Sequence, residues 1–127
     1  MMIQFSRKLF IATFILFLPS LAFAHAHLIK AEPAEKSVAK EIPTQIVLKF
    51  SEELESSLCR IEVKDAVTGK VVSTGNTEIV DGTQDTIQTK LNAAAKTSKL
   101  KVSWKVVSKD AHKMKGDYEF SIDANGK

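Results

Sequence analysis

Apolar and polar side chains alternate along most of the chain beyond residue 44. An alternation with a period of two is typical of β-strands that bury one face. It predicts strands over residues 45–50, 59–63, 78–80, 86–91, 99–106 and 117–122, with a short strand at Val71-Val72. Trp104 and Tyr118 fall on the apolar sides of their strands, so we expect both to pack in the core.

Turn-forming residues separate these segments. Thr68-Gly69 predicts a turn, and Asp81-Gly82 predicts a hairpin-type turn. Residues 92–96 are compatible with a short helical turn, and the acidic stretch 51–55 is expected to be a solvated turn rather than a cation site. Turn signals spaced by about eight to twelve residues are typical of all-β domains. We therefore predict an all-β fold, a Greek-key β-sandwich or small barrel of about seven strands.

The first residues predict an export signal. Arg7-Lys8 precedes an apolar run over residues 9–18, and Ala22-Phe23-Ala24 forms a small-x-small cleavage box. The run is shorter than the roughly 20 residues that span a bilayer, so a cleaved signal is favoured over a membrane anchor. We expect residues 1–24 to be a cleaved secretory signal peptide, and residues 25–127 to form one soluble periplasmic domain.

Charge and cysteine content exclude several classes of protein. The chain has 18 basic and 15 acidic residues, and Arg7 and Lys8 lie in the predicted signal, so the exported domain carries a net charge of +1. This balance does not favour binding to nucleic acid or anionic lipid. Cys59 is the only cysteine, so no internal disulfide forms. The alternation places it on the core side with Ile61 and Val63, which predicts a buried, inert thiol.

The three histidines fall in two short clusters. His25 and His27 lie at the predicted cleavage site, where a second box, Ala24-His25-Ala26, overlaps the first. Cleavage at either box leaves an N-terminal histidine, whose free amine has an ordinary pKa of about 7.7–8.0 and binds metals readily. Asp110 and His112 are two residues apart, so an extended segment would point both to one side. Nitrogen and oxygen donors of these kinds suit Cu(II).

The N-terminal histidines allow two copper geometries. In the first, the amine and imidazole of one histidine join Asp110 and His112. In the second, His25-Ala26-His27 wraps Cu(II) or Ni(II) through the amine, two deprotonated amides and the second imidazole. The two compete for the same coordination plane. We expect the first near neutral pH, because it needs no amide deprotonation, and a gain for the second at high pH.

Several short motifs follow one another along the chain: His25-Ala26-His27-Leu28, Glu32-Pro33-Ala34, Ile42-Pro43, residues 46–52, Val102-Ser103-Trp104, residues 107–112 and residues 116–122. In this order and spacing, the chain resembles the CopC-type periplasmic copper-resistance proteins. The resemblance implies a small immunoglobulin-like or cupredoxin-like β-barrel that binds Cu(II) near one end. It also implies that the amine and imidazole of His25 bind the copper ion together with Asp110 and His112, with His27 assisting.

Three features depart from the family's pattern. Met114 is the only methionine of the predicted domain, so a methionine-rich Cu(I) site is absent. Ser98 and Leu100 stand where the family often has Gly-x-Tyr. The sequence stops at Lys127 without a membrane domain, so we expect any inner-membrane copper transporter that acts with it to be a separate protein.

The favoured function is a periplasmic, non-enzymatic Cu(II)-binding protein for copper homeostasis, resistance or delivery to a membrane partner, acting as a monomer. Two alternatives remain open. One is a copper redox enzyme with a histidine brace, like the lytic polysaccharide monooxygenases, although the aromatic residues with clear alternation point inward. The other is a metal-free immunoglobulin-like interaction module, which the strand pattern fits equally well.

Overall fold

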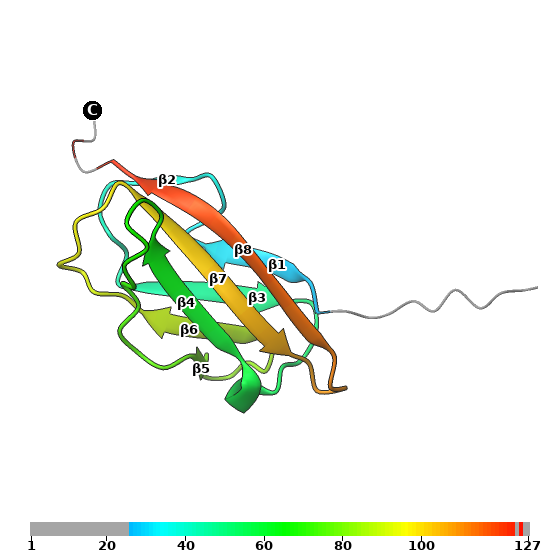
Figure 1. The fold of residues 1–127 in the computed structure, drawn as a ribbon. Helices are drawn as coiled ribbons and strands as arrows, with labels where there is room; N and C mark the ends of the chain where they lie inside the picture. The colour runs from blue at the N-terminus through cyan, green and yellow to red at the C-terminus, as the bar shows by residue number, and fades with distance from the viewer. Residues whose placement is uncertain (1–25, 124, 126–127) are drawn as a thin grey trace, which may run out of the picture.

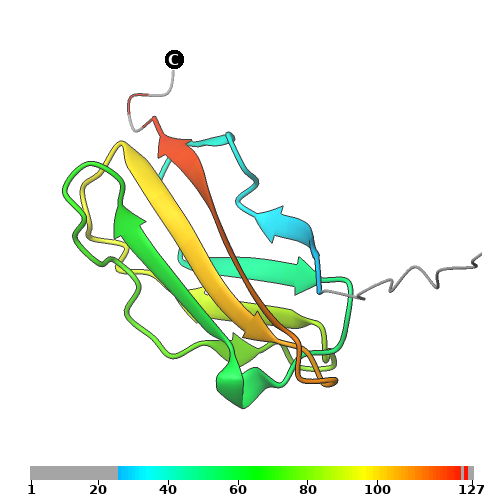
Figure 2. The same cartoon turned by 45° about the vertical axis from the view of Figure 1, so that its right-hand side comes forward.

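The computed structural model describes residues 26–123 and residue 125. The predicted signal peptide, its cleavage site and His25 lie outside the described residues. The described chain forms two four-stranded sheets that face each other (Figure 1; Figure 2). The all-β sandwich prediction is confirmed, with eight strands in place of about seven.

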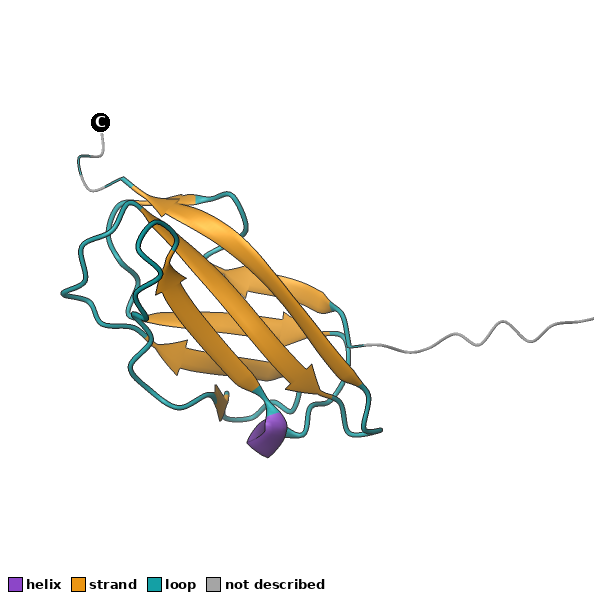
Figure 3. Ribbon diagram, viewed as in Figure 1, coloured by secondary structure: helices purple, strands orange, loops and turns teal. Residues whose placement is uncertain are grey.

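The two sheets have the same size and differ in strand direction. The first has the order β1-β3-β6-β5 and is antiparallel throughout. The second has the order β2-β8-β7-β4, and only β2 runs parallel to its neighbour. The strands are β1 (Leu28–Glu32), β2 (Val38–Ala39), β3 (Gln45–Phe50), β4 (Arg60–Asp65), β5 (Glu78–Ile79), β6 (Thr86–Lys90), β7 (Lys99–Val107) and β8 (Lys113–Ile122). A 3-10 turn, η1 (Ser56–Leu58), precedes β4 (Figure 3).

The core lies between the sheets and is built from the alternating apolar positions. Ile46, Leu48 and Phe50 of β3 are fully buried and face Val102 of β7 and Phe120 of β8 in one apolar cluster. The predicted alternation in these strands is therefore confirmed. Cys59 is also buried, as predicted, and its thiol contacts the carbonyl oxygens of Glu55 at 3.4 Å and Val107 at 3.8 Å. Burial raises the pKa of this thiol, which keeps it protonated and unreactive.

Two local predictions differ from the structure. Val71-Val72 is not a strand, because the chain crosses here from one sheet to the other. Val71 bridges to Lys64 of β4 and Ser73 bridges to Leu91, so neither sheet holds the segment for more than one residue. Residues 92–96 form a turn without helix, in which the side chain of Asn92 accepts a hydrogen bond from the amide of Ala94 at 3.0 Å.

The predicted turns are present. Gly69 has φ 75° in the turn after β4, and Gly82 has φ 79° in the loop that joins β5 to its antiparallel neighbour β6. Glycine adopts this left-handed backbone without the strain that a Cβ would bring. Among residues 26–123 and 125, no helix has the length and apolar character needed to cross a membrane.

Aromatic rings fill the core next to β8. Trp104 is partly buried, and its ring centroid lies 6.2 Å from that of Phe50 and 6.1 Å from that of Tyr118. The indole covers Gly116, where an added Cβ would lie 2.3 Å from the ring. The Tyr118 hydroxyl donates a hydrogen bond to the carbonyl of Pro33 at 2.8 Å and so ties β8 to the segment after β1. Both aromatic residues are packed in the core, as predicted.

Candidate metal centre

The tight turn between β7 and β8 brings Asp110 and His112 together. The amide of Ser108 donates to the carbonyl of His112 at 3.0 Å, and the amide of Ala111 donates to the carbonyl of Ser108 at 2.9 Å. Ala111 closes the turn with φ 68°, a left-handed conformation that is uncommon for a residue with a Cβ. As a result, Oδ2 of Asp110 lies 2.9 Å from Nδ1 of His112. The expectation of an extended segment is wrong here, because the turn and not strand alternation pairs the side chains.

Ser108 holds both of these residues from beneath. Its side chain is 1% exposed, and its hydroxyl donates a hydrogen bond to Oδ1 of Asp110. The hydroxyl oxygen of Ser108 also accepts a hydrogen bond from the amide of His112 at 3.2 Å. The hydrogen bond from Ser108, and after it the one from His112, lowers the pKa of the Asp110 carboxyl. Asp110 is therefore a carboxylate at neutral pH, oriented on one side by a buried hydroxyl and on the other by an imidazole.

The acidic stretch 51–55 links this turn to the start of the described chain. The amide of Lys109 donates to the carbonyl of Glu53 at 3.0 Å, and the amide of Glu55 donates to the carbonyl of Val107 at 2.8 Å. Leu54 pairs with Ser108 in an isolated bridge and is 2% exposed. The stretch is therefore partly buried and braces the turn, whereas the sequence predicts a solvated turn.

His27 is fixed to the beginning of the same stretch. Its amide donates to the Ser51 hydroxyl at 2.8 Å, and its carbonyl accepts from the Ser51 amide at 2.8 Å. The His27 side chain is exposed, while Ala26 before it is 1% exposed. Figure 1 shows β1 beginning at the end of the sandwich where the β7–β8 turn lies. The first described residues, Ala26 and His27, therefore lie at the same end of the sandwich as Asp110 and His112.

The described part of the chain holds two of the four predicted ligands in contact. Asp110 and His112 adjoin each other, and His27 lies at the other end of the bracing stretch 51–55. Within residues 26–123 and 125, no group of three or more histidine, cysteine, aspartate or glutamate side chains is close enough to hold a metal ion. The predicted site also includes His25, which lies outside the described residues.

Ser108 and Ser51 are the residues that sequence reasoning missed. Ser108 stands in the motif 107–112, but its role depends on its burial beside its bridge partner Leu54, which no local pattern reveals. The only available signal is that Ser108 continues the apolar positions of β7 two residues beyond Val106, where a serine is unexpected. A buried polar residue in an apolar series needs a partner, and here the partners are Asp110 and His112.

Comparison with known proteins gives related chains and related folds. A model of the CopC domain matches residues 28–123. The chain is 34% identical over 109 residues to the copper transport protein CutJ of Bacillus subtilis (strain 168). The aligned region covers 86% of the chain and 20% of CutJ. It thus spans about a fifth of that relative's length. It is also 32% identical over 100 residues to the protein YobA of Escherichia coli (strain K12), covering 79% of the chain and 80% of YobA.

Solved structures have the same fold. The crystal structure of CopC from Methylosinus trichosporium OB3b superposes with a TM-score of 0.72 and 25% identity, covering 81% of the chain and 98% of that structure. The methionine-rich copper resistance protein PcoC from Escherichia coli superposes with a TM-score of 0.67 and 21% identity, covering 78% of the chain and 99% of PcoC. The PcoC likeness concerns the fold alone.

Proposed function

The chain belongs to the CopC family, and from that premise we propose that it is an exported, periplasmic Cu(II)-binding protein that holds copper for resistance or for delivery to a membrane transporter. The family consists of copper-binding proteins and not of enzymes, in agreement with the prediction of a non-catalytic protein. The observation that carries the proposal is the contact of 2.9 Å between Asp110 and His112 at the end of the sandwich where the chain leaves towards residue 25.

The donors of this site suit Cu(II). We propose His25, through its amine and imidazole, and His112, through its ring, as nitrogen ligands, with a carboxylate oxygen from Asp110 and His27 as an accessory histidine. A tetragonal set of nitrogen and oxygen donors is the set that Cu(II) prefers. Histidines that bind metals commonly turn their second ring nitrogen to a carboxylate, and Nδ1 of His112 faces Asp110 in this way. Copper would then meet a ring whose orientation is already fixed.

The structure also bears on the competing wrap of the N-terminal residues around copper. That wrap needs a deprotonated amide at both Ala26 and His27. The His27 amide donates a hydrogen bond to the Ser51 hydroxyl at 2.8 Å, and Ala26 is 1% exposed. Wrapping would break this hydrogen bond and pull Ala26 out of the core, so it carries a cost that the site with Asp110 and His112 avoids. This supports the shared site near neutral pH.

The test compares proteins that differ by one residue at the N-terminus. One begins at His25, and the other begins at Ala24, so that the free amine and the His25 imidazole no longer belong to the same residue. We expect the second protein to bind Cu(II) more weakly by on the order of 100-fold, measured by competition with a copper chelator. Equal affinities would refute the role of the His25 amine.

Two controls separate the geometries and the export step. Cu(II) EPR at neutral pH should change with His112→Ala and persist with His27→Ala; the reverse result would assign copper to the N-terminal wrap. N-terminal sequencing of the exported protein should give His25, and a start at His27 would transfer the amine's role to that residue. Any other start would remove the amine from the site.

A further inference from the structure

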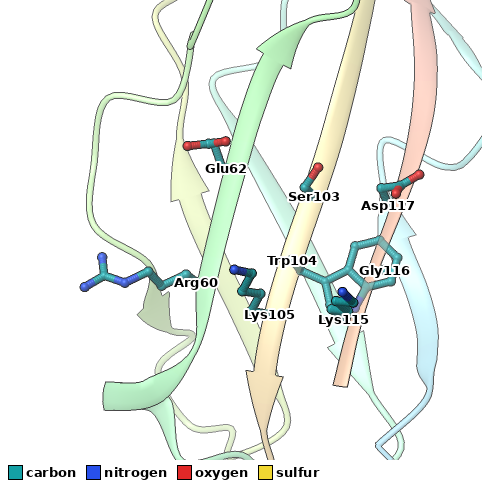
Figure 4. Close-up of a pocket in the computed structure, with 8 residues that line it drawn as sticks. All are labelled: Arg60, Glu62, Ser103, Trp104, Lys105, Lys115, Gly116 and Asp117. Atoms are coloured by element: carbon teal, nitrogen blue, oxygen red, sulfur yellow. The ribbon is translucent and has the colours of Figure 1, made fainter. Parts of the chain in front are cut away.

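Three basic side chains lie side by side on the outer face of the second sheet. Arg60 of β4 is directly opposite Lys105 of β7, which is directly opposite Lys115 of β8. All three are exposed, and we call them the basic row. Residues directly opposite in an antiparallel pair have Cβ atoms about 4.5–5.5 Å apart, and like charges in such a pair destabilise the sheet. The fold therefore places like charges at neighbouring positions of three strands, and the repulsion is weakest at Arg60, whose guanidinium extends away from Lys105 (Figure 4).

Nothing in the described chain relieves this repulsion. Among residues 26–123 and 125, no side chain forms a hydrogen bond or ion pair with any side chain of the basic row. The nearby carboxylate of Glu62 is engaged by Lys64 at 3.2 Å. On the same sheet, by contrast, Lys99 contacts Glu119 at 3.0 Å and Lys64 contacts Glu62. Uncompensated like charges break a rule of stable sheets, and proteins break such rules mainly at functional sites. The basic row is therefore a candidate functional site.

A second row of opposite character lies next to the basic row. Glu62 of β4, Ser103 of β7 and Asp117 of β8 pair across the same three strands. Figure 4 shows the two rows crossing the three strands one after the other, around a hollow that is also lined by Trp104 and Gly116. Because the basic row borders an acidic and polar row, the face has a defined pattern of charge and not a uniform positive field.

We propose that this face docks a partner protein through an extended acidic segment with carboxylates two residues apart. Neighbouring strands lie about 4.7–4.9 Å apart, so the backbone positions of the basic row span roughly 10 Å. Carboxylates at alternate positions of an extended segment lie about 6.6–6.8 Å apart, so two of them fit between three cations. Each would contact two cations and remove the repulsion between them.

The second row selects a protein segment over a polyanion. A nucleic acid or an anionic membrane would press further negative charge against Glu62 and Asp117, which separate the basic row from the next cations on this face, Lys64 and Lys101. A protein segment can instead place hydroxyl, amide or lysine donors opposite these acids. Electrostatic complementarity of this kind fixes the register of a complex and speeds its formation more than it strengthens it.

The docking face adjoins the candidate metal centre. Lys105 and Lys115 lie two residue pairs before the last pair of the β7–β8 ladder, Val107 with Lys113. At about 3.4 Å per residue, the basic row is therefore roughly 7 Å along the strands from the turn that holds Asp110 and His112. A partner seated on the row would lie beside these residues. This last step rests on the proposed function, whereas docking itself does not.

The experiment uses the ¹⁵N-labelled exported domain and a short synthetic peptide of alternating glutamate and threonine, with a glutamine–threonine peptide as its neutral control. We expect the acidic peptide alone to shift the amide signals of Arg60, Lys105 and Lys115, with affinity that falls as salt is added. The double variant Lys105→Glu/Lys115→Glu should weaken binding by about tenfold or more, because it reverses two of three contacts. The matched double variant Lys70→Glu/Lys90→Glu, with the same change of net charge, should bind as the wild type does.

Three results would overturn the proposal: equal binding by the two double variants, peptide-induced shifts confined to other surfaces, or shifts of these amides by phosphatidylglycerol vesicles but not by the peptide. Thermal melting supplies an independent check. Lys105→Glu places an acid between two cations, so its Tm should equal or exceed that of the wild type, and a clear fall would indicate a structural role for the row. Copper affinity should be unchanged in every variant of the row, which separates failure of docking from failure of the copper site.

Discussion

Two aspartates end up in tight turns of this sandwich, and they are used in different ways. Oδ1 of Asp65, at the end of β4, accepts hydrogen bonds from the amides of Val67 at 2.8 Å and Thr68 at 3.2 Å. In the β7–β8 turn, Asp110 accepts a hydrogen bond from the Ser108 hydroxyl and faces the ring of His112. Asp65 therefore closes its own turn, while Asp110 is held by side chains and points towards another functional group.

The pKa is lowered at both positions and does not distinguish them. At Asp65 the main cause is the backbone amide of Val67, and at Asp110 it is the hydroxyl of Ser108. A carboxylate bound by the amides of its own turn has used its hydrogen-bonding capacity for local structure. A carboxylate oriented by a buried side chain beside an imidazole has been positioned for a ligand. The identity of the partners, and not the shift of the pKa, separates the structural aspartate from the candidate functional one.

The most direct test of this difference is to substitute residues in each turn and measure the affinity of the protein for Cu(II). His112→Ala removes a proposed nitrogen ligand and should weaken Cu(II) binding by on the order of 100-fold. Asp110→Asn should weaken it less, because an oxygen remains. Asp65→Asn should leave the affinity unchanged. Competition titrations with a Cu(II) chelator measure all three, and a loss at Asp65→Asn equal to that at His112→Ala would show that the turns are not functionally distinct.

Ser108→Ala tests whether the β7–β8 turn is positioned by its buried hydroxyl. The variant leaves the His112 amide without that acceptor and Asp110 without its donor, so we expect a loss of about 1–2 kcal/mol in the free energy of unfolding. Copper affinity should fall by about tenfold, as for other residues that orient a ligand. Ser103→Ala, in β7 before the turn, is the matched control. A fall in stability with unchanged copper affinity would make Ser108 purely structural.

The smallest effect is expected at Asp65, and it concerns stability as a function of pH. The folded-state pKa of Asp65 lies below its ordinary value of 3.8, so the ionised carboxylate stabilises the fold above that pH. This contribution is lost as the pH falls through the lowered pKa. Thermal melting of wild type and Asp65→Ala should therefore differ most near neutral pH and converge in acid. A difference that grows in acid would contradict the assignment.

The strands with a visible alternation beyond residue 44 could be predicted from sequence, and β1 and β2 could not. Alternation is visible where several residues in succession bury one side, as in β3 and β7. β2 has only two residues and is defined by its pairing with β8, so its formation depends on a strand more than 70 residues away. Val71-Val72 shows the reverse case, because its apolar composition suggests a strand where the chain in fact changes sheets.

The candidate site could likewise be predicted only in part, because some of its features depend on contacts between distant segments. The sequence identifies Asp110 and His112 as donors two residues apart, but their contact depends on the left-handed backbone of Ala111, which alanine does not signal. Ser108 acquires its role only once the fold buries it beside Leu54, its partner in an isolated bridge. Residue types thus indicate which chemistry is available, while the fixed geometry comes from contacts between segments that are distant in sequence.

The aromatic pair beneath β8 gives the protein a built-in optical signature. The chain has one tryptophan and one tyrosine, and the centroids of their rings lie 6.1 Å apart. At so short a separation, light absorbed by Tyr118 is passed to Trp104, and the closed sandwich emits as an indole whichever ring is excited. Unfolding of the β7–β8 hairpin separates the two rings and restores phenol emission. The intensity ratio of the two bands therefore follows the integrity of the hairpin that carries Asp110 and His112, without any added dye.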